Sequence, residues 1–153
     1  MSAPSGPDNF LALEDELVER LKERLADLVP KLKVLTSSDL AGVTEEQQHT
    51  PAVHVIYRGY RVVESPRADG NTARIEQTWL AVVATRNTKA MRSGSAARAD
   101  AGLISRRVMT ALMGFKAPGM SKPLRIADAP EAKFTAGFQY LPMAFVAEHA
   151  FSN

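Results

Sequence analysis

The chain has 153 residues, of which 45% are hydrophobic and 24% are charged, and its formal net charge is +2 at pH 7. This length is typical of one domain that buries roughly two-thirds of the surface it would expose when unfolded. The composition excludes a wholly disordered chain and a coiled-coil rod. No apolar run approaches about 18 residues, which excludes a transmembrane helix, so no membrane partner is expected. Because the chain contains no cysteine, disulfides, thiol catalysis and thiolate metal sites are excluded as well.

The N-terminal third begins with a segment rich in proline and glycine. This segment predicts a flexible N-terminal arm over residues 1–7, followed by one α+β domain over residues 8–153. It has no positive cluster followed by an apolar stretch, so no secretory signal is expected. Leucines at steps of three and four from Leu13 to Leu28 form one apolar stripe. They predict a helix from Asp8 to Val29 that Pro30 ends.

Three strands are expected after this helix. Residues 31–36 alternate apolar and polar side chains, and β-branched and aromatic residues dominate 52–63, where Gly59 indicates a bulge or a bend. After turn chemistry at Asp69-Gly70, residues 74–86 predict a long strand that is apolar on both faces near its middle. The last two strands therefore form a long hairpin that projects from the sheet.

The C-terminal half predicts a second helix and further strands. Residues 96–113 have an apolar side made of alanine, isoleucine, valine and leucine, and Gly114 is placed to end this helix. Residues 124–151 are expected to form strand segments that Pro130 and Pro142 interrupt. The sequence thus predicts an α+β fold with a mostly antiparallel β-sheet and a long hairpin, packed against two α-helices.

Motifs of enzyme sites are missing from the sequence. The histidines His49, His54 and His149 do not have the spacing of metal ligands, and no nucleophile elbow or phosphate-binding loop is present. Glu64, Asp69 and Glu76 resemble the carboxylate cluster of a nuclease. Alternation along a hairpin explains them more simply, as residues of a solvated face. We therefore predict no enzyme activity, no catalytic residue, no metal site and no cofactor.

The distribution of charge is more informative than any motif. Residues 1–50 hold ten acidic and five basic side chains, a net −5, whereas residues 51–125 hold four acidic and thirteen basic ones, a net +9. Ten of these thirteen cations are arginines, which favour bidentate contacts to carboxylate or phosphate. Three interpretations stay open: solvated faces of a hairpin and a helix, an acidic protein partner, or the DNA backbone.

The order of these elements resembles the tail-terminator (tail-completion) proteins of long-tailed bacteriophages, in particular the Mu-like contractile-tail branch. The resemblance extends from about Phe10 to Phe151. It rests on five segments: FLALEDELVERL (10–21), PAVHVIYRGY (51–60), RIEQTWLAVVATRN (74–87), MTALMGF (109–115) and YLPMAFVAEHAF (140–151).

The resemblance implies a structural virion protein, assembled in the host cytoplasm, that forms a ring on the head-proximal end of the tail tube. Such a ring, commonly a hexamer, stops tube polymerisation and offers the head a joining surface, without cofactor or chemistry. The implied partners are further copies of the chain, the tail-tube protein and the head–tail connector or neck protein, with DNA passing through the ring. The alternatives are a head-completion or neck adaptor protein and a small DNA-binding module.

A closed ring needs a heterologous interface, in which one patch meets a different patch on the neighbour. The acidic first third and the basic middle third of this chain are complementary in charge. We therefore expect contacts to a neighbouring subunit or to the tube from the hairpin, from its long strand and from the loop after it. The candidate residues are Arg61, Arg67, Arg74, Trp79, Lys89 and Arg92.

Overall fold

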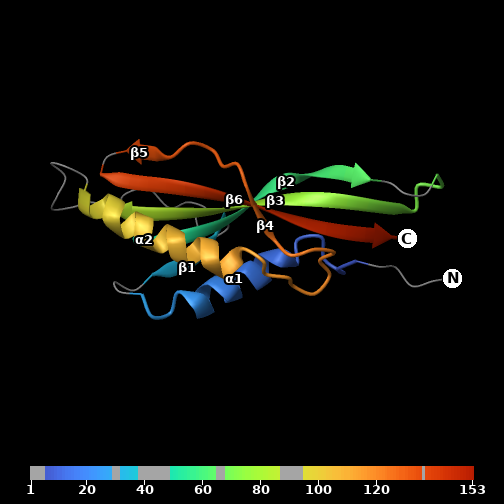
Figure 1. Ribbon diagram of the computed structural model, residues 1–153, viewed down its shortest axis with the longest axis horizontal. Helices are drawn as coiled ribbons and strands as arrows, with labels where there is room; N and C mark the ends of the chain where they lie inside the picture. Colours follow the sequence, from blue (N-terminus) through green and yellow to red (C-terminus); the bar gives the residue numbers. More distant parts are fainter. Residues whose placement is uncertain (1–5, 29–31, 38–48, 65–67, 87–94, 136) are drawn as a thin grey trace.

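The computed structural model describes residues 6–28, 32–37, 49–64, 68–86, 95–135 and 137–153. The elements, in chain order, are α1 (Leu13–Arg24), β1 (Lys33–Thr36), β2 (Ala52–Glu64), β3 (Thr72–Arg86), α2 (Ser95–Leu112), β4 (Arg125–Ala127), β5 (Lys133–Thr135) and β6 (Phe138–Ser152). Both helices lie on the same side of the sheet (Figure 1). The α+β class, the two helices and the long hairpin are confirmed. No helix within the described ranges is long and apolar enough to cross a membrane.

The sheet has six strands in the order β1-β2-β3-β6-β4, and β5 pairs with β6 as well. The long strands β2, β3 and β6 are antiparallel to one another, whereas β1 runs parallel to β2. β3 lies between two long neighbours, so it is central in the sheet, and in its middle Leu80 and Val82 on the face away from the helices are only partly buried. The ends of β2, β3 and β6 near the C-terminus extend past the helices (Figure 1). We call this half of the sheet the distal sheet, made of residues 58–64, 72–78 and 146–152.

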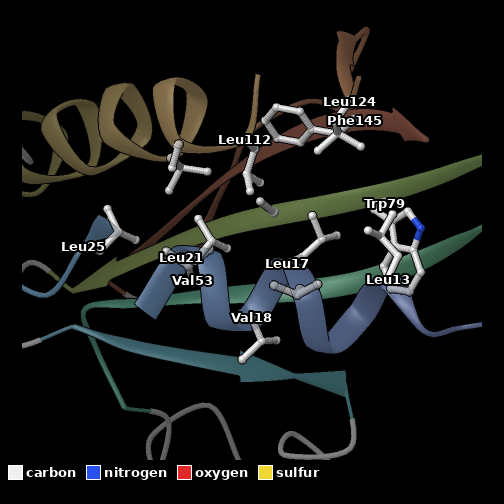
Figure 2. Close-up of a cluster of buried hydrophobic side chains, with 14 of the residues drawn as sticks. Leu13, Leu17, Val18, Leu21, Leu25, Val53, Trp79, Leu112, Leu124 and Phe145 are labelled. Atoms are coloured by element: carbon white, nitrogen blue, oxygen red, sulfur yellow. The ribbon is translucent and has the colours of Figure 1, made fainter. Parts of the chain in front are cut away.

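The core lies between the helices and one face of the sheet. Leu17 and Leu21 of α1 are almost completely buried, as the leucine stripe predicts. Figure 2 shows the side chains of α1 gathered with Val53 of β2, Trp79 of β3, Leu112 of α2 and Phe145 of β6. Trp79 and Phe145 are opposite each other in the β3–β6 register, so they point to the same face.

The two helices are also joined by arginines at their edges. Arg20 of α1 donates a hydrogen bond to the carbonyl oxygen of Ala111 at 2.9 Å, and its guanidinium lies 4.9 Å from the centroid of the Phe115 ring. Arg107 of α2 forms an ion pair with Asp27 and donates to the carbonyl oxygen of Arg24. These contacts tie α1 and the turn after it to α2 and its C-terminal end.

Helix α1 is shorter than the sequence predicts. Residues 9–12 form turns closed by hydrogen bonds from Ala12 N to Asn9 O and from Glu14 N to Leu11 O, and regular α-helix begins only at Leu13. The Asn9 side chain accepts from the Leu11 amide at 2.9 Å, so it caps this entry turn rather than the helix. Of the proposed arm, Gly6 and Pro7 lie against Phe151 and Gly119. The proposed stop at Pro30 and the first five residues lie outside the described ranges.

Pro142 does not interrupt a strand, contrary to expectation. It lies inside β6 and faces Val82 of β3 in an unbroken register. On the other edge of β6, β5 pairs with Phe138–Tyr140 and β4 with Ala144–Val146, so Pro142 falls between them. Because neither short strand needs an N–H at this position, a proline is tolerated. Pro130 does lie between β4 and β5, as predicted.

The bulge predicted at Gly59 is confirmed. The β2–β3 register shifts between Tyr57 and Gly59, and Gly59 has a φ of 123°. This backbone conformation is one that only glycine adopts without strain. The bulge decides which side chains of the distal sheet point to which face, because it shifts the β2–β3 register.

We expect Gly59→Ala to lower the free energy of unfolding by about 1–3 kcal/mol, because alanine is strained at this φ although no atom lies within 4 Å of its added carbon. The matched control is Gly102→Ala in α2, which also meets open space but has no positive φ. It should stabilise the protein by about 0.5–1 kcal/mol. Urea denaturation followed by circular dichroism measures both values. Equal effects of the two substitutions on the free energy of unfolding would mean that the backbone at position 59 does not require glycine.

Candidate assembly interface

A cluster of six charged side chains occupies the face of the distal sheet that points away from the helices. Glu76 of β3 and Glu148 of β6 are opposite each other in the register and lie on the face opposite Trp79 and Phe145. Four cations surround these two carboxylates, and they come from β2, β3, β4 and the loop before β4. We call this set the charged cluster: Arg61, Arg74, Glu76, Lys122, Arg125 and Glu148.

Glu76 is held by two arginines from different strands. Arg61 Nε lies 3.0 Å from Glu76 Oε2, and Arg125 Nη2 lies 2.8 Å from Oε1. The carboxylate is only 8% exposed. The hydrogen bond from Arg125 and the charges of both arginines outweigh burial, and they hold the pKa of Glu76 below its ordinary value of 4.5.

Glu148 has a similar surrounding on the neighbouring strand. It is almost fully buried, and Arg74 Nε lies 3.2 Å from its Oε1, while Lys122 Nζ lies 3.6 Å from its Oε2. Four cations and two anions leave the charged cluster with a net charge of +2. The carboxylates are covered while the side chains of the four cations are 41–71% exposed, so the surface presented to a partner is positive.

The lowered pKa of Glu76 predicts a pH dependence of stability. Since the folded-state pKa lies below 4.5, the ionised carboxylate stabilises the fold above about that pH, and the contribution is lost as pH falls through the lower folded-state value. We expect the unfolding free energy of the Glu76→Gln variant to fall less steeply with decreasing pH below about 4.5 than that of the parent. Urea titrations between pH 5 and about 2 measure this difference. Parallel curves would mean that the two arginines do not stabilise the charged form.

The opposite face of the distal sheet carries exposed apolar and aromatic side chains. Tyr60 and Val62 are 59% and 56% exposed and lie opposite Gln77 and Ile75, on the face of Trp79. The Phe10 ring lies edge-on to Tyr60, with centroids 5.5 Å apart, and stacks on Phe151 at 5.8 Å. Sequence reasoning assigned apolar contact area to the middle of β3 and missed this patch. The bulge at Gly59 is what turns Tyr60 and Val62 to this face.

The candidate contact residues have different locations. Arg61 and Arg74 both lie in the charged cluster, where each already pairs with a carboxylate of its own chain. Trp79 is 1% exposed, belongs to the core and donates from Nε1 to Gln77 Oε1 at 3.1 Å, so its role in the folded chain is packing. Arg67, Lys89 and Arg92 lie outside the described residues.

A second charged surface runs along the outer face of α1. The side chains of Asp15, Glu16, Glu19 and Glu23 are exposed there. Among the described residues, Lys22 is the one cation that forms an ion pair with any of these carboxylates. Its Nζ lies 3.9 Å from Glu19 Oε1. The acidic face of α1 and the positive charged cluster are therefore separate surfaces of the fold, although Asp27 of the first third pairs with Arg107 of the middle third.

These features define a small α+β protein in which one layer of helices leaves a distal sheet with two unlike faces. The sequence profile of the phage tail terminator protein family matches residues 9–153, and the chain belongs to this family. It is therefore a structural protein of the virion tail. The further assignment to the Mu-like branch stays a prediction.

A solved structure supports the fold independently. The chain is similar to a chain in the structure described as "Virion of native gene transfer agent (GTA) particle", with a TM-score of 0.56 and 15% sequence identity. The similarity covers 91% of this chain and 95% of that one. No protein among the curated sequences matches the chain.

Proposed function

We propose that this chain forms a ring, commonly six-membered in this family, on the head-proximal end of the tail tube. The ring stops tube polymerisation and presents the surface to which the head joins, and it acts without a cofactor and without catalysis. The observation that carries this proposal is the family match over residues 9–153. The proposed partners are further copies of the chain, the tail-tube protein and the neck protein.

The two charged surfaces support a head-to-tail contact between subunits. A ring requires two different patches that complement each other, and the positive charged cluster and the acidic face of α1 have opposite signs. Exposed ion pairs contribute only about 0–1 kcal/mol each. We therefore propose that the charges set the register between subunits and that buried apolar area supplies the affinity. Tyr60 and Val62 are exposed for this purpose on β2, on the face opposite the charged cluster.

The charged cluster decides which variants can test this interface. Reversing Arg61 to glutamate would place a second carboxylate beside Glu76, which is buried, and would destabilise the monomer itself. Replacement by glutamine avoids this, because Glu76 keeps Arg125 and Glu148 keeps Lys122. The neutral double variant Arg61→Gln/Arg74→Gln therefore separates contact from folding.

We expect Arg61→Gln/Arg74→Gln to fold and to leave most tail tubes uncapped, so that they grow beyond normal length in a reconstituted tube assembly viewed by electron microscopy. The matched control removes two exposed cations outside the distal sheet, Lys116→Gln/Lys133→Gln, and should cap normally. Tubes of normal length with the first variant would remove the charged cluster from the interface. Binding to isolated neck protein without binding to tubes would favour the adaptor alternative.

A further inference from the structure

A separate pocket lies where the entry to α1 meets the loop before β4. Its volume is about 360 Å³, and its walls come from residues 6–8, from the start of α1, from Pro118 and Gly119, and from His149 of β6. The polar side chains in this wall are those of Asp8, Glu16 and His149. None of these three residues belongs to the charged cluster.

His149 shows what kind of group the pocket lacks. The side chain is 3% exposed, and its Nδ1 lies 3.1 Å from the carbonyl oxygen of Gly119. Because a carbonyl oxygen only accepts, Nδ1 carries the hydrogen, and in this tautomer Nε2 is an acceptor. This Nε2 is buried and has no hydrogen-bond partner among the described residues. A buried acceptor without a donor is unfavourable, so a donor supplied from outside would be stabilising.

The two carboxylates of the pocket also lack cations. In the described part of the chain, neither Asp8 nor Glu16 forms an ion pair, in contrast to Glu76 and Glu148, each of which has two. The described residues contain no group of three His, Asp or Glu side chains placed to hold a metal ion. The three acceptors thus share one pocket but are not arranged around a point. A broad, planar cation with several donors suits such a set better than a small spherical one.

The wall of the pocket is built by close packing. Gly6 has a φ of 100°, and a Cβ at this position would lie 2.5 Å from the ring of Phe151. A Cβ on Gly119 would lie 3.3 Å from Pro7. Both glycines therefore allow the entry segment to lie tightly against β6 and the loop, which forms this wall of the pocket.

We propose that this pocket binds the guanidinium group of an arginine from a second copy of the chain. This step rests on the proposed ring, because it supplies the acidic half of the subunit contact. Arginine offers five N–H donors and one positive charge to a wall of acceptors, and residues 51–125 of each copy carry ten arginines. The pocket lies at the N-terminal end of the acidic face of α1, so it extends the surface already assigned to the neighbouring subunit.

The binding test uses the full chain at a concentration where light scattering shows it dissociated, with N-acetyl-arginine amide as the probe. We expect a saturable shift of the His149 ring signals in the NMR spectrum, and apparent affinity at least about tenfold lower in Asp8→Asn/Glu16→Gln. The control Glu131→Gln removes an exposed carboxylate between β4 and β5 that belongs neither to the pocket nor to α1, and should bind as the parent does. Absence of a saturable shift, or an equal shift with N-acetyl-norvaline amide, would overturn the proposal.

The assembly test identifies the source of the arginine. We expect Asp8→Asn/Glu16→Gln to weaken ring formation on tail tubes by about tenfold, with Glu131→Gln unchanged. If the arginine probe binds but ring formation is unaffected, the ligand does not come from a second copy and that part of the proposal is wrong. If the probe fails to bind while rings still form, the pocket proposal is wrong and the proposed function stands.

Discussion

Replacing Leu21 by alanine should lower the free energy of unfolding by about 2–5 kcal/mol, a large part of the roughly 5–15 kcal/mol that holds a domain of this kind folded. Leu21 is 0% exposed and lies in the cluster that joins α1 to the sheet (Figure 2). Its removal takes away apolar area buried between two layers and leaves a cavity that helix and sheet, both regular, cannot easily close.

The control for Leu21 is the same substitution at Leu103 of α2, which is 58% exposed. Leu103→Ala should change the free energy of unfolding by less than about 0.5 kcal/mol. The Leu103 side chain is already largely in contact with water, so its removal loses little buried apolar area. Chemical denaturation with both variants gives the comparison. Similar midpoints for the two would show that the leucine stripe of α1 does not face the core.

Replacing Trp79 by alanine should cost about 3–5 kcal/mol of stability. The indole fills the end of the core near Leu13, and Tyr57 packs against it with ring centroids 5.1 Å apart. The indole N–H also donates to Gln77 Oε1, and Gln77 in turn donates to the carbonyl oxygen of Phe10 at 2.8 Å. Loss of Trp79 therefore weakens the link between the distal sheet and the entry to α1.

Two measurements separate this packing role from a contact role for Trp79. The variant Trp79→Phe keeps most of the apolar volume but leaves the Gln77 acceptor without its donor, and should cost about 1–3 kcal/mol. Thermal and urea denaturation of the isolated chain give both values. An alanine variant that keeps its stability but no longer caps tubes would instead make Trp79 a contact residue.

The sequence alone determined the elements whose signal is local. The leucine stripe of α1, the apolar side of α2 and the glycine at position 114 are spacings within one helix or at its end, and the structure places them as expected. The hairpin and its bulge at Gly59 also follow from neighbouring residues. The order of these segments carried the family resemblance as well, and the family match confirms it.

Only the tertiary structure decided which strands and charges meet. The parallel pairing of β1 with β2 and the place of Pro142 between two short edge strands depend on strand order, which no local spacing encodes. The charged cluster depends on it in the same way. Glu76 receives Arg125 and Glu148 receives Arg74 because β3, β6 and β4 are neighbours in the sheet although they are distant in the chain. Since long-range charge pairs form only after the strands have paired, sequence reasoning found two of the four cations of this surface, Arg61 and Arg74, and did not foresee their carboxylate partners within the same chain.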